Sequence, residues 1–250
     1  MIVKKIFVFS IYLIATSISV LAQDQEKTVT TTEKKYARPD IPGTFVLELG
    51  LNRVISPQEK FNIGLWGSRA LNIYYQYDMR ILKSKFSFHP GIGFGLERYK
   101  MKTGYIVSYD NNNDLAMQTA DNLGLSGLKK SQLITNYLDV PLELRFSTNP
   151  EDPTRSFKVA VGVRGGYLIG SHTKIKYSED GRTVKRKDKE EFNLNKFRYG
   201  AFLKVGGGNF SIFGYYNIST VFQKGKGPQF GQNQPKDMTN WTIGISLSSF

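Results

Sequence analysis

Residues 137–146, YLDVPLELRF, decide how the rest of the chain is interpreted. Large apolar residues alternate here with charged residues and one proline: the apolar positions are Leu138, Val140, Leu142, Leu144 and Phe146. Because successive side chains of a β-strand point to opposite faces, the stretch has one apolar face and one charged face. The medium that each face contacts therefore determines the architecture.

The same two-residue period recurs along the chain after residue 43. Seven further segments carry it, at about 44–53, 69–82, 85–101, 156–172, 194–206, 209–222 and 239–250. Helical spacing fits none of them better, so the pattern predicts eight strands.

The connections between these segments alternate in length. Short turns at 83–85, 148–155 and 206–209 alternate with long loops at 54–68, 102–131, 173–193 and 223–238. An even number of strands with this alternation is typical of bacterial outer-membrane barrels. We therefore predict an all-β fold, a single antiparallel eight-stranded up-and-down transmembrane β-barrel with both termini on the periplasmic side. Asp180-Gly181 within the third long loop predicts a hairpin that prolongs the flanking strands.

The ends of the chain indicate export. Lys4 and Lys5 precede an apolar run over 6–14 and a small-residue end at Ala22, which predicts a signal peptide over 1–22. The run is short for the alternative, an N-terminal membrane anchor. Polar residues 23–43 predict a flexible periplasmic leader, and 44–250 form the predicted outer-membrane barrel domain. The sequence has no Cys, which excludes a lipoprotein anchor and disulfide bonds.

The charge balance favours an anionic surface as a partner. Without the predicted signal peptide, the chain has 32 basic and 21 acidic residues, a formal charge of +11 spread along its length. No nucleic-acid-binding module is recognisable, whereas outer-membrane lipid and lipopolysaccharide suit an exported basic protein. The third long loop is the richest in cations, and it is expected to contact lipid-A phosphates or a partner protein, or to be a solvated hairpin: Lys174, Lys176, Arg182, Lys185, Arg186, Lys187 and Lys189.

The polar faces of the predicted strands are rich in glycine and carry both signs of charge. That composition suits a narrow lumen, because charges facing lipid at mid-depth would cost about 2–4 kcal/mol each. Large aromatic residues near both ends of the apolar faces resemble interfacial girdles. We expect a lumen packed with ion pairs rather than an open pore. Its predicted members are Glu48, Asp78, Arg80, Glu97, Asp139, Glu143, Arg145, Lys158, Arg164, Lys196, Arg198 and Lys204.

The stretch NYLDVPLELRF, residues 136–146, resembles the Tyr-Leu-acidic-Val/Ile-Pro-Leu pattern of PorT-family outer-membrane β-barrel proteins of Gram-negative bacteria. The resemblance covers about 44–250 and implies the barrel fold and an outer-membrane location. Some members of that family serve secretion, so it also implies an envelope protein partner. The end of the chain, WTIGISLSSF, is similar to the signal that the barrel-insertion machinery reads, although Phe250 is out of phase with the apolar face of this strand.

Acid–base chemistry has few candidate residues. The two histidines are His89 and His172, and His172 follows Ser171 at the loop end of a predicted strand. No cluster has metal-ligand spacing, and no cofactor is expected. We therefore expect a non-enzymatic barrel with a structural or interaction role. The alternatives are an accessory component of an outer-membrane secretion or transport assembly, and a lipid-A-modifying enzyme that uses His172.

Overall fold

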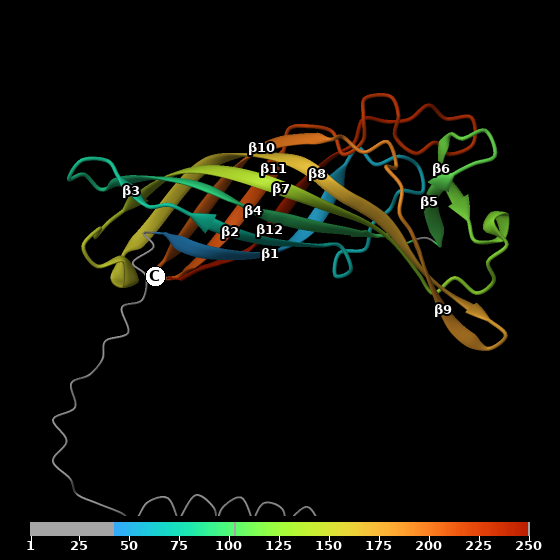
Figure 1. Ribbon diagram of the computed structural model, residues 1–250, viewed down its shortest axis with the longest axis horizontal. Helices are drawn as coiled ribbons and strands as arrows, with labels where there is room; N and C mark the ends of the chain where they lie inside the picture. The colour runs from blue at the N-terminus through green and yellow to red at the C-terminus, as the bar shows by residue number, and fades with distance from the viewer. Residues whose placement is uncertain (1–42, 103, 250) are drawn as a thin grey trace, which may run out of the picture. The chain divides into compact units, whose positions relative to one another are not determined.

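The computed structural model describes residues 43–102 and 104–249. The predicted signal peptide, the leader up to residue 42 and Phe250 lie outside these residues. Eight strands form the wall of a barrel: β1 (Thr44–Ile55), β2 (Arg69–Gln76), β4 (Phe86–Lys100), β7 (Lys130–Ser147), β8 (Phe157–Glu179), β10 (Phe197–Gly207), β11 (Phe210–Asn217) and β12 (Thr239–Ser248). β1 pairs with β12 and β8 with β10, so the antiparallel sheet closes on itself (Figure 1). The predicted fold class is confirmed.

The two faces of YLDVPLELRF contact different media, as the alternation predicts. Leu138, Val140, Leu142 and Leu144 point outward and are 37–46% exposed. Asp139 and Glu143 are fully buried inside the barrel. An eight-stranded barrel is just wide enough for side chains to fill its interior, so the inward charges must satisfy one another there.

Pro141 lies where the β4–β7 ladder is interrupted. Pro90 pairs with Leu142 and Gly93 with Asp139, and the residues between these two pairs have no partner across the ladder. Because proline cannot donate a backbone hydrogen bond, an interrupted position is where a strand can accept it.

Four shorter strands lie outside the wall. β3 (Met79–Arg80) pairs with β4, and β9 (Arg182–Asp188) pairs with β8 around Asp180-Gly181, which confirms the predicted hairpin. β5 (Tyr105–Tyr109) and β6 (Leu115–Thr119) form a separate two-stranded sheet that the sequence did not predict. Two single-turn 3₁₀ helices, η2 (Asp121–Leu123) and η3 (Pro153–Arg155), complete the described chain. Neither of these helices has the length or apolar character to cross a membrane.

The long loops share one hydrophobic cluster, which we call the cap core. It combines residues from all four long loops with the loop-side ends of the barrel strands: Phe61, Ile63, Tyr99, Met101, Val107, Leu115, Met117, Leu133, Phe192, Leu194, Val221, Phe222 and Met238. The rings of Phe61 and Phe222 meet edge to face at 5.9 Å between centroids. Figure 1 shows β5 and β6 at the same end of the barrel as these loops. The loops therefore form a folded cap over one end of the barrel.

Replacing Phe222 with Ala tests this cap. Loss of a fully buried ring should destabilise the cap by about 3–5 kcal/mol, seen as faster limited proteolysis of the loops in folded protein. Phe197→Ala is the matched control because Phe197 is 66% exposed on the outer surface of the barrel. Equal proteolysis rates for both variants would contradict a shared cap core.

Candidate functional site in the barrel lumen

Arg198 joins strands from opposite parts of the barrel wall. Its guanidinium makes two contacts with Asp139, from Nη2 to Oδ2 at 2.6 Å and from Nε to Oδ1 at 3.1 Å, and one with Glu97 at 2.8 Å. The ring of Tyr137 lies 4.1 Å from the guanidinium carbon, and Tyr74 donates a hydrogen bond to Asp139. Bidentate pairing of this kind is the strongest geometry available to arginine. β10, β4 and β7 are thereby tied together through the lumen.

A second cluster lies next to the first. Glu48 accepts contacts from Arg164 at 2.8 Å and from Lys204 at 2.9 Å. Lys204 also bridges to Glu143 at 2.9 Å, and Arg145 contacts the other oxygen of Glu143 at 2.7 Å. Each cation therefore has a carboxylate partner, as burial of ions in a closed space requires.

Two glycines make room for the Arg198–Asp139 pair. A Cβ atom at Gly95 would lie 2.0 Å from Nη2 of Arg198, and one at Gly166 would lie 2.1 Å from Oδ1 of Asp139. No side chain fits at such distances. The glycine-rich polar faces of the strands are therefore a condition for filling a narrow barrel with ion pairs.

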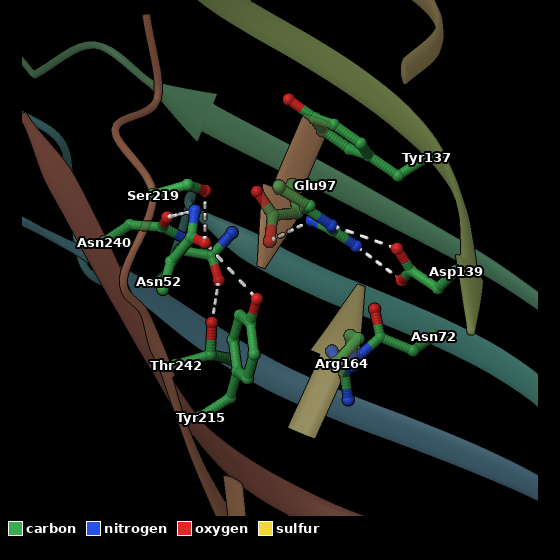
Figure 2. Close-up of polar contacts among 12 residues, drawn as sticks. Asn52, Asn72, Glu97, Tyr137, Asp139, Arg164, Tyr215, Ser219, Asn240 and Thr242 are labelled. Atoms are coloured by element: carbon green, nitrogen blue, oxygen red, sulfur yellow. Dashed lines mark hydrogen bonds and ion pairs between the residues drawn. The ribbon is translucent and has the colours of Figure 1, made fainter. Parts of the chain in front are cut away.

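An uncharged polar layer lies beside the ion pairs at the cap end of the lumen, where Tyr99 of the cap core also donates a hydrogen bond to Glu97. Asn217 donates to Asn240 at 2.9 Å and accepts from Ser219 at 2.9 Å, while Thr242 donates to Asn52 at 2.7 Å. Figure 2 shows these amides and hydroxyls gathered to one side of Glu97, with Asp139 on the other side. The sequence reasoning missed this layer, although its members alternate with apolar residues in the same way as the charged positions.

His89 links Ser87 and Asp78 at the other end of the lumen. Its Nε2 lies 2.7 Å from Oγ of Ser87, and its Nδ1 contacts the carboxylate of Asp78. Serine hydrolases use these three groups in this order. Here Ser87 sits inside the sheet, paired with Arg80 of β3 and Arg145 of β7, so its backbone belongs to the ladder instead of forming an oxyanion hole. The chain of contacts joins the mouth of the lumen to the turn after β2.

Nine of the twelve charges predicted for the lumen are buried there: Glu48, Glu97, Asp139, Glu143, Arg145, Lys158, Arg164, Arg198 and Lys204. Asp78 lies at the mouth, where it pairs with His89. Arg80 and Lys196 are exceptions, since both are exposed and pair with Glu151 and Glu191. They have the inward phase, but Arg80 lies on the short strand β3 outside the barrel wall and Lys196 precedes the first residue of β10, so neither is enclosed.

The structure separates Ser171 from His172, the residue on which the lipid-A-modifying alternative depends. Ser171 pairs with Thr135 on the inner face of the sheet, while His172 pairs with Ile134 on the outer face. The hydroxyl of Ser171 donates instead to the backbone oxygen of Glu190 at 2.5 Å. Neighbouring residues of a strand point to opposite sides, which separates the two groups. The lipid-A-modifying alternative thereby loses its proposed catalytic pair.

The described part of the chain contains no cluster of side chains that could bind a metal ion. Across residues 43–102 and 104–249, no group of three or more His, Asp or Glu side chains is arranged to hold a metal ion. The carboxylates of the lumen are instead taken up by arginine and lysine.

The closed wall, the apolar exterior and the ion-paired interior define a transmembrane β-barrel. The family model described as outer membrane protein beta-barrel domain matches residues 23–223. The chain belongs to this family, and its location is the bacterial outer membrane. No curated protein matches the chain.

Three solved structures resemble the chain in fold. The crystal structure of Ail, the attachment invasion locus protein of Yersinia pestis, is 16% identical with a TM-score of 0.33, covering 83% of this chain and 97% of that one. The backbone structure of Ail in a phospholipid bilayer nanodisc gives 14% identity, a TM-score of 0.31, and coverage of 83% and 99%. The crystal structure of the N-terminal β-barrel domain of Pseudomonas aeruginosa OprF is 10% identical in sequence with a TM-score of 0.26, and the match covers 83% of this chain and 98% of that one.

Replacing Arg198 with Ala tests the lumen network. The change leaves Asp139 and Glu97 buried without their cation, which should destabilise the barrel by about 3–5 kcal/mol. The measurement is the temperature at which folded protein in detergent loses its heat-modifiable mobility on a gel. Lys196→Ala, two residues earlier and exposed, should shift this temperature little. Similar shifts for both variants would refute the role assigned to Arg198.

Proposed function

We propose that this protein is a non-conducting, non-enzymatic outer-membrane barrel that presents its folded cap to other molecules. The closed lumen is the observation that carries the proposal. A cavity of about 170 Å³ lies at the mouth beside His89 and Lys158, and one of about 20 Å³ is lined by Glu143 and Lys204 and also by Lys158 and Gly208 near the short turns. The second has room for about one water molecule. Beyond it come the ion pairs, the amide layer and the cap core.

Planar-bilayer recording tests the closed lumen. The folded protein should give no steady conductance steps. The double variant Phe61→Ala/Phe222→Ala, which opens the cap core, should remain silent as well, because the ion pairs still fill the lumen below it. Regular single-channel steps from the unaltered protein would overturn the proposal, and steps from the double variant alone would mean that the cap is the plug.

The cap is proposed to lie at the cell surface, with both termini periplasmic. This orientation follows the usual placement of short turns in outer-membrane barrels. Because the chain has no Cys, single cysteines report on accessibility without background. In intact cells, Arg182→Cys in the β8–β9 hairpin should react with a membrane-impermeant maleimide, whereas Lys83→Cys in the turn between β3 and β4 should react only after the outer membrane is opened. The reverse pattern would invert the orientation.

A second candidate function is that of an accessory component in an outer-membrane secretion or transport assembly. The PorT-like stretch at 136–146 supports it, and so does Leu82, which is 88% exposed at the tip of the turn between β3 and β4. A photo-crosslinking residue at position 82 should then capture one defined envelope protein in cells, while the same residue at position 149, in a turn at the same end, should not. Identical capture at both positions would argue against a specific contact.

A further inference from the structure

The outer surface of the barrel is apolar along most of the wall and becomes basic toward the cap. Tyr167 and Phe197 pair across β8 and β10 with their ring centroids 5.1 Å apart, and both are exposed. Aromatic residues in such positions mark the level of lipid headgroups. β4, β7 and β8 continue past this level toward the cap, and their outward residues are there mostly polar or basic, with Ile134 as an apolar exception.

Strand register arranges the cations of this region in adjoining rows. The first row holds Arg69, Arg98, Ile134 and His172, the second holds Lys100, Gln132, Lys174 and Lys187, and the third holds Lys130, Lys176 and Lys185. Residues directly opposite on adjacent antiparallel strands share a face of the sheet. We call Arg98, Lys100, Lys130, Lys174, Lys176, Lys185 and Lys187 the exterior basic face. None of these rows contains an acidic residue.

This arrangement places like charges directly opposite one another. Lys176 faces Lys130 on one side and Lys185 on the other, while Lys174 faces Lys187. Directly opposed like charges destabilise a sheet. Among the described residues, no carboxylate pairs with any member of the exterior basic face, in contrast to the lumen, where the cations contact carboxylates. The part of the chain that the structure describes therefore leaves this repulsion uncompensated.

The electrostatics agree with the register. Burial and the nearby cations Lys100 and Lys176 lower the pKa of Lys130 below its usual value. Burial and Lys187 likewise lower the pKa of His172. Side chains from four different strands are thus close enough to repel one another, and an anion placed among them would be bound by several cations at once.

An apolar surface adjoins the exterior basic face at Arg98. A groove of about 650 Å³ on the outside of the barrel is lined by Leu49, Leu51, Leu71 and Leu96, and Arg69 and Arg98 also line it. An anionic group held at Arg98 would therefore have apolar surface beside it. A lipid has this combination of an anionic headgroup and an acyl chain.

We propose that the exterior basic face binds the phosphate groups of lipopolysaccharide in the outer leaflet. Lipid A carries two phosphate groups, one at each end of its glucosamine disaccharide, so a single headgroup can place anions at two points among the lysines of neighbouring strands, whereas a glycerophospholipid such as phosphatidylglycerol supplies one phosphate. Basic clusters beside the membrane are recognised lipid-phosphate sites. The inference rests on the orientation proposed above, but it does not depend on whether the cap binds a partner or the lumen conducts.

The test measures lipid binding to the full mature chain folded in detergent, by native mass spectrometry. The variant Lys100→Gln/Lys130→Gln/Lys174→Gln/Lys176→Gln removes four members of the exterior basic face. Its affinity for diphosphoryl lipid A should fall by about tenfold or more. The control Lys83→Gln/Lys85→Gln/Lys224→Gln/Lys226→Gln removes the same number of exposed cations elsewhere, and its affinity should stay within about twofold of that of the unaltered protein.

The lipid probes decide the source of the phosphate. The unaltered protein should bind diphosphoryl lipid A more tightly than monophosphoryl lipid A, and the four-lysine variant should lose this preference. Equal affinities of the variant and the unaltered protein would overturn the proposal. Equal binding of phosphatidylglycerol and diphosphoryl lipid A would overturn the assignment to lipopolysaccharide. Binding in detergent does not depend on orientation, so the cysteine labelling described above fails or succeeds separately.

Discussion

The narrowness of an eight-stranded barrel is the constraint on which this structure depends. Its interior admits side chains but little water, so an inward charge must meet an opposite charge within the reach of its own side chain. Arg198 satisfies this condition by contacting Asp139 and Glu97 on two other strands. The condition also acts on neighbouring positions, because Gly95 and Gly166 must remain without side chains to leave room for the pair. The narrow lumen therefore requires both the paired charges and the glycines that leave room for them.

The exterior is arranged by a different rule. Along the belt, outward positions need only be apolar, and leucine, isoleucine, valine and aromatic residues serve equally. Above the belt, where β4, β7 and β8 rise past Tyr167, lysine, arginine and histidine take many of the outward positions, and no acidic residue lies opposite them. Both regions belong to the same strands and obey the same alternation. The change from apolar to basic residues at the outward positions therefore reflects the medium that these residues contact and not a change of fold. Inside the barrel, cations are matched by the protein, whereas on the exterior basic face the matching charge must come from the surroundings.

Much of this architecture could be predicted from the sequence because alternation is a local property. The segment around Asp139 shows its lumen face and its lipid face within ten residues, and the positions of the wall strands follow from the same signal, although β8 runs on to Glu179 and β11 ends at Asn217. Arg80 and Lys196 show the limit of the method, because they have the inward phase but lie beyond the enclosed part of the wall. Ser171 and His172 are adjacent in the sequence, but neighbouring residues of a strand point to opposite faces, so adjacency does not bring their side chains together. The cap core was missed because Phe61, Phe192 and Phe222 come from separate loops, and the loops show no period that indicates their contact.

The two ends of the lumen are closed by different physical means, and this difference bears on function. Toward the short turns, His89 and Asp78 form a polar mouth with a small cavity. Toward the long loops, neutral amides lie beside the ion pairs, and Tyr99 of the hydrophobic cap core donates a hydrogen bond to Glu97. A pore would need a continuous water-filled path from one end to the other, and the packed ion pairs and the cap core both interrupt it. Loops that belong to a shared core also hold a defined surface, since none of them can move far without exposing buried aromatic rings. A barrel built in this way is suited to holding that surface at the membrane, and poorly suited to passing solutes through it.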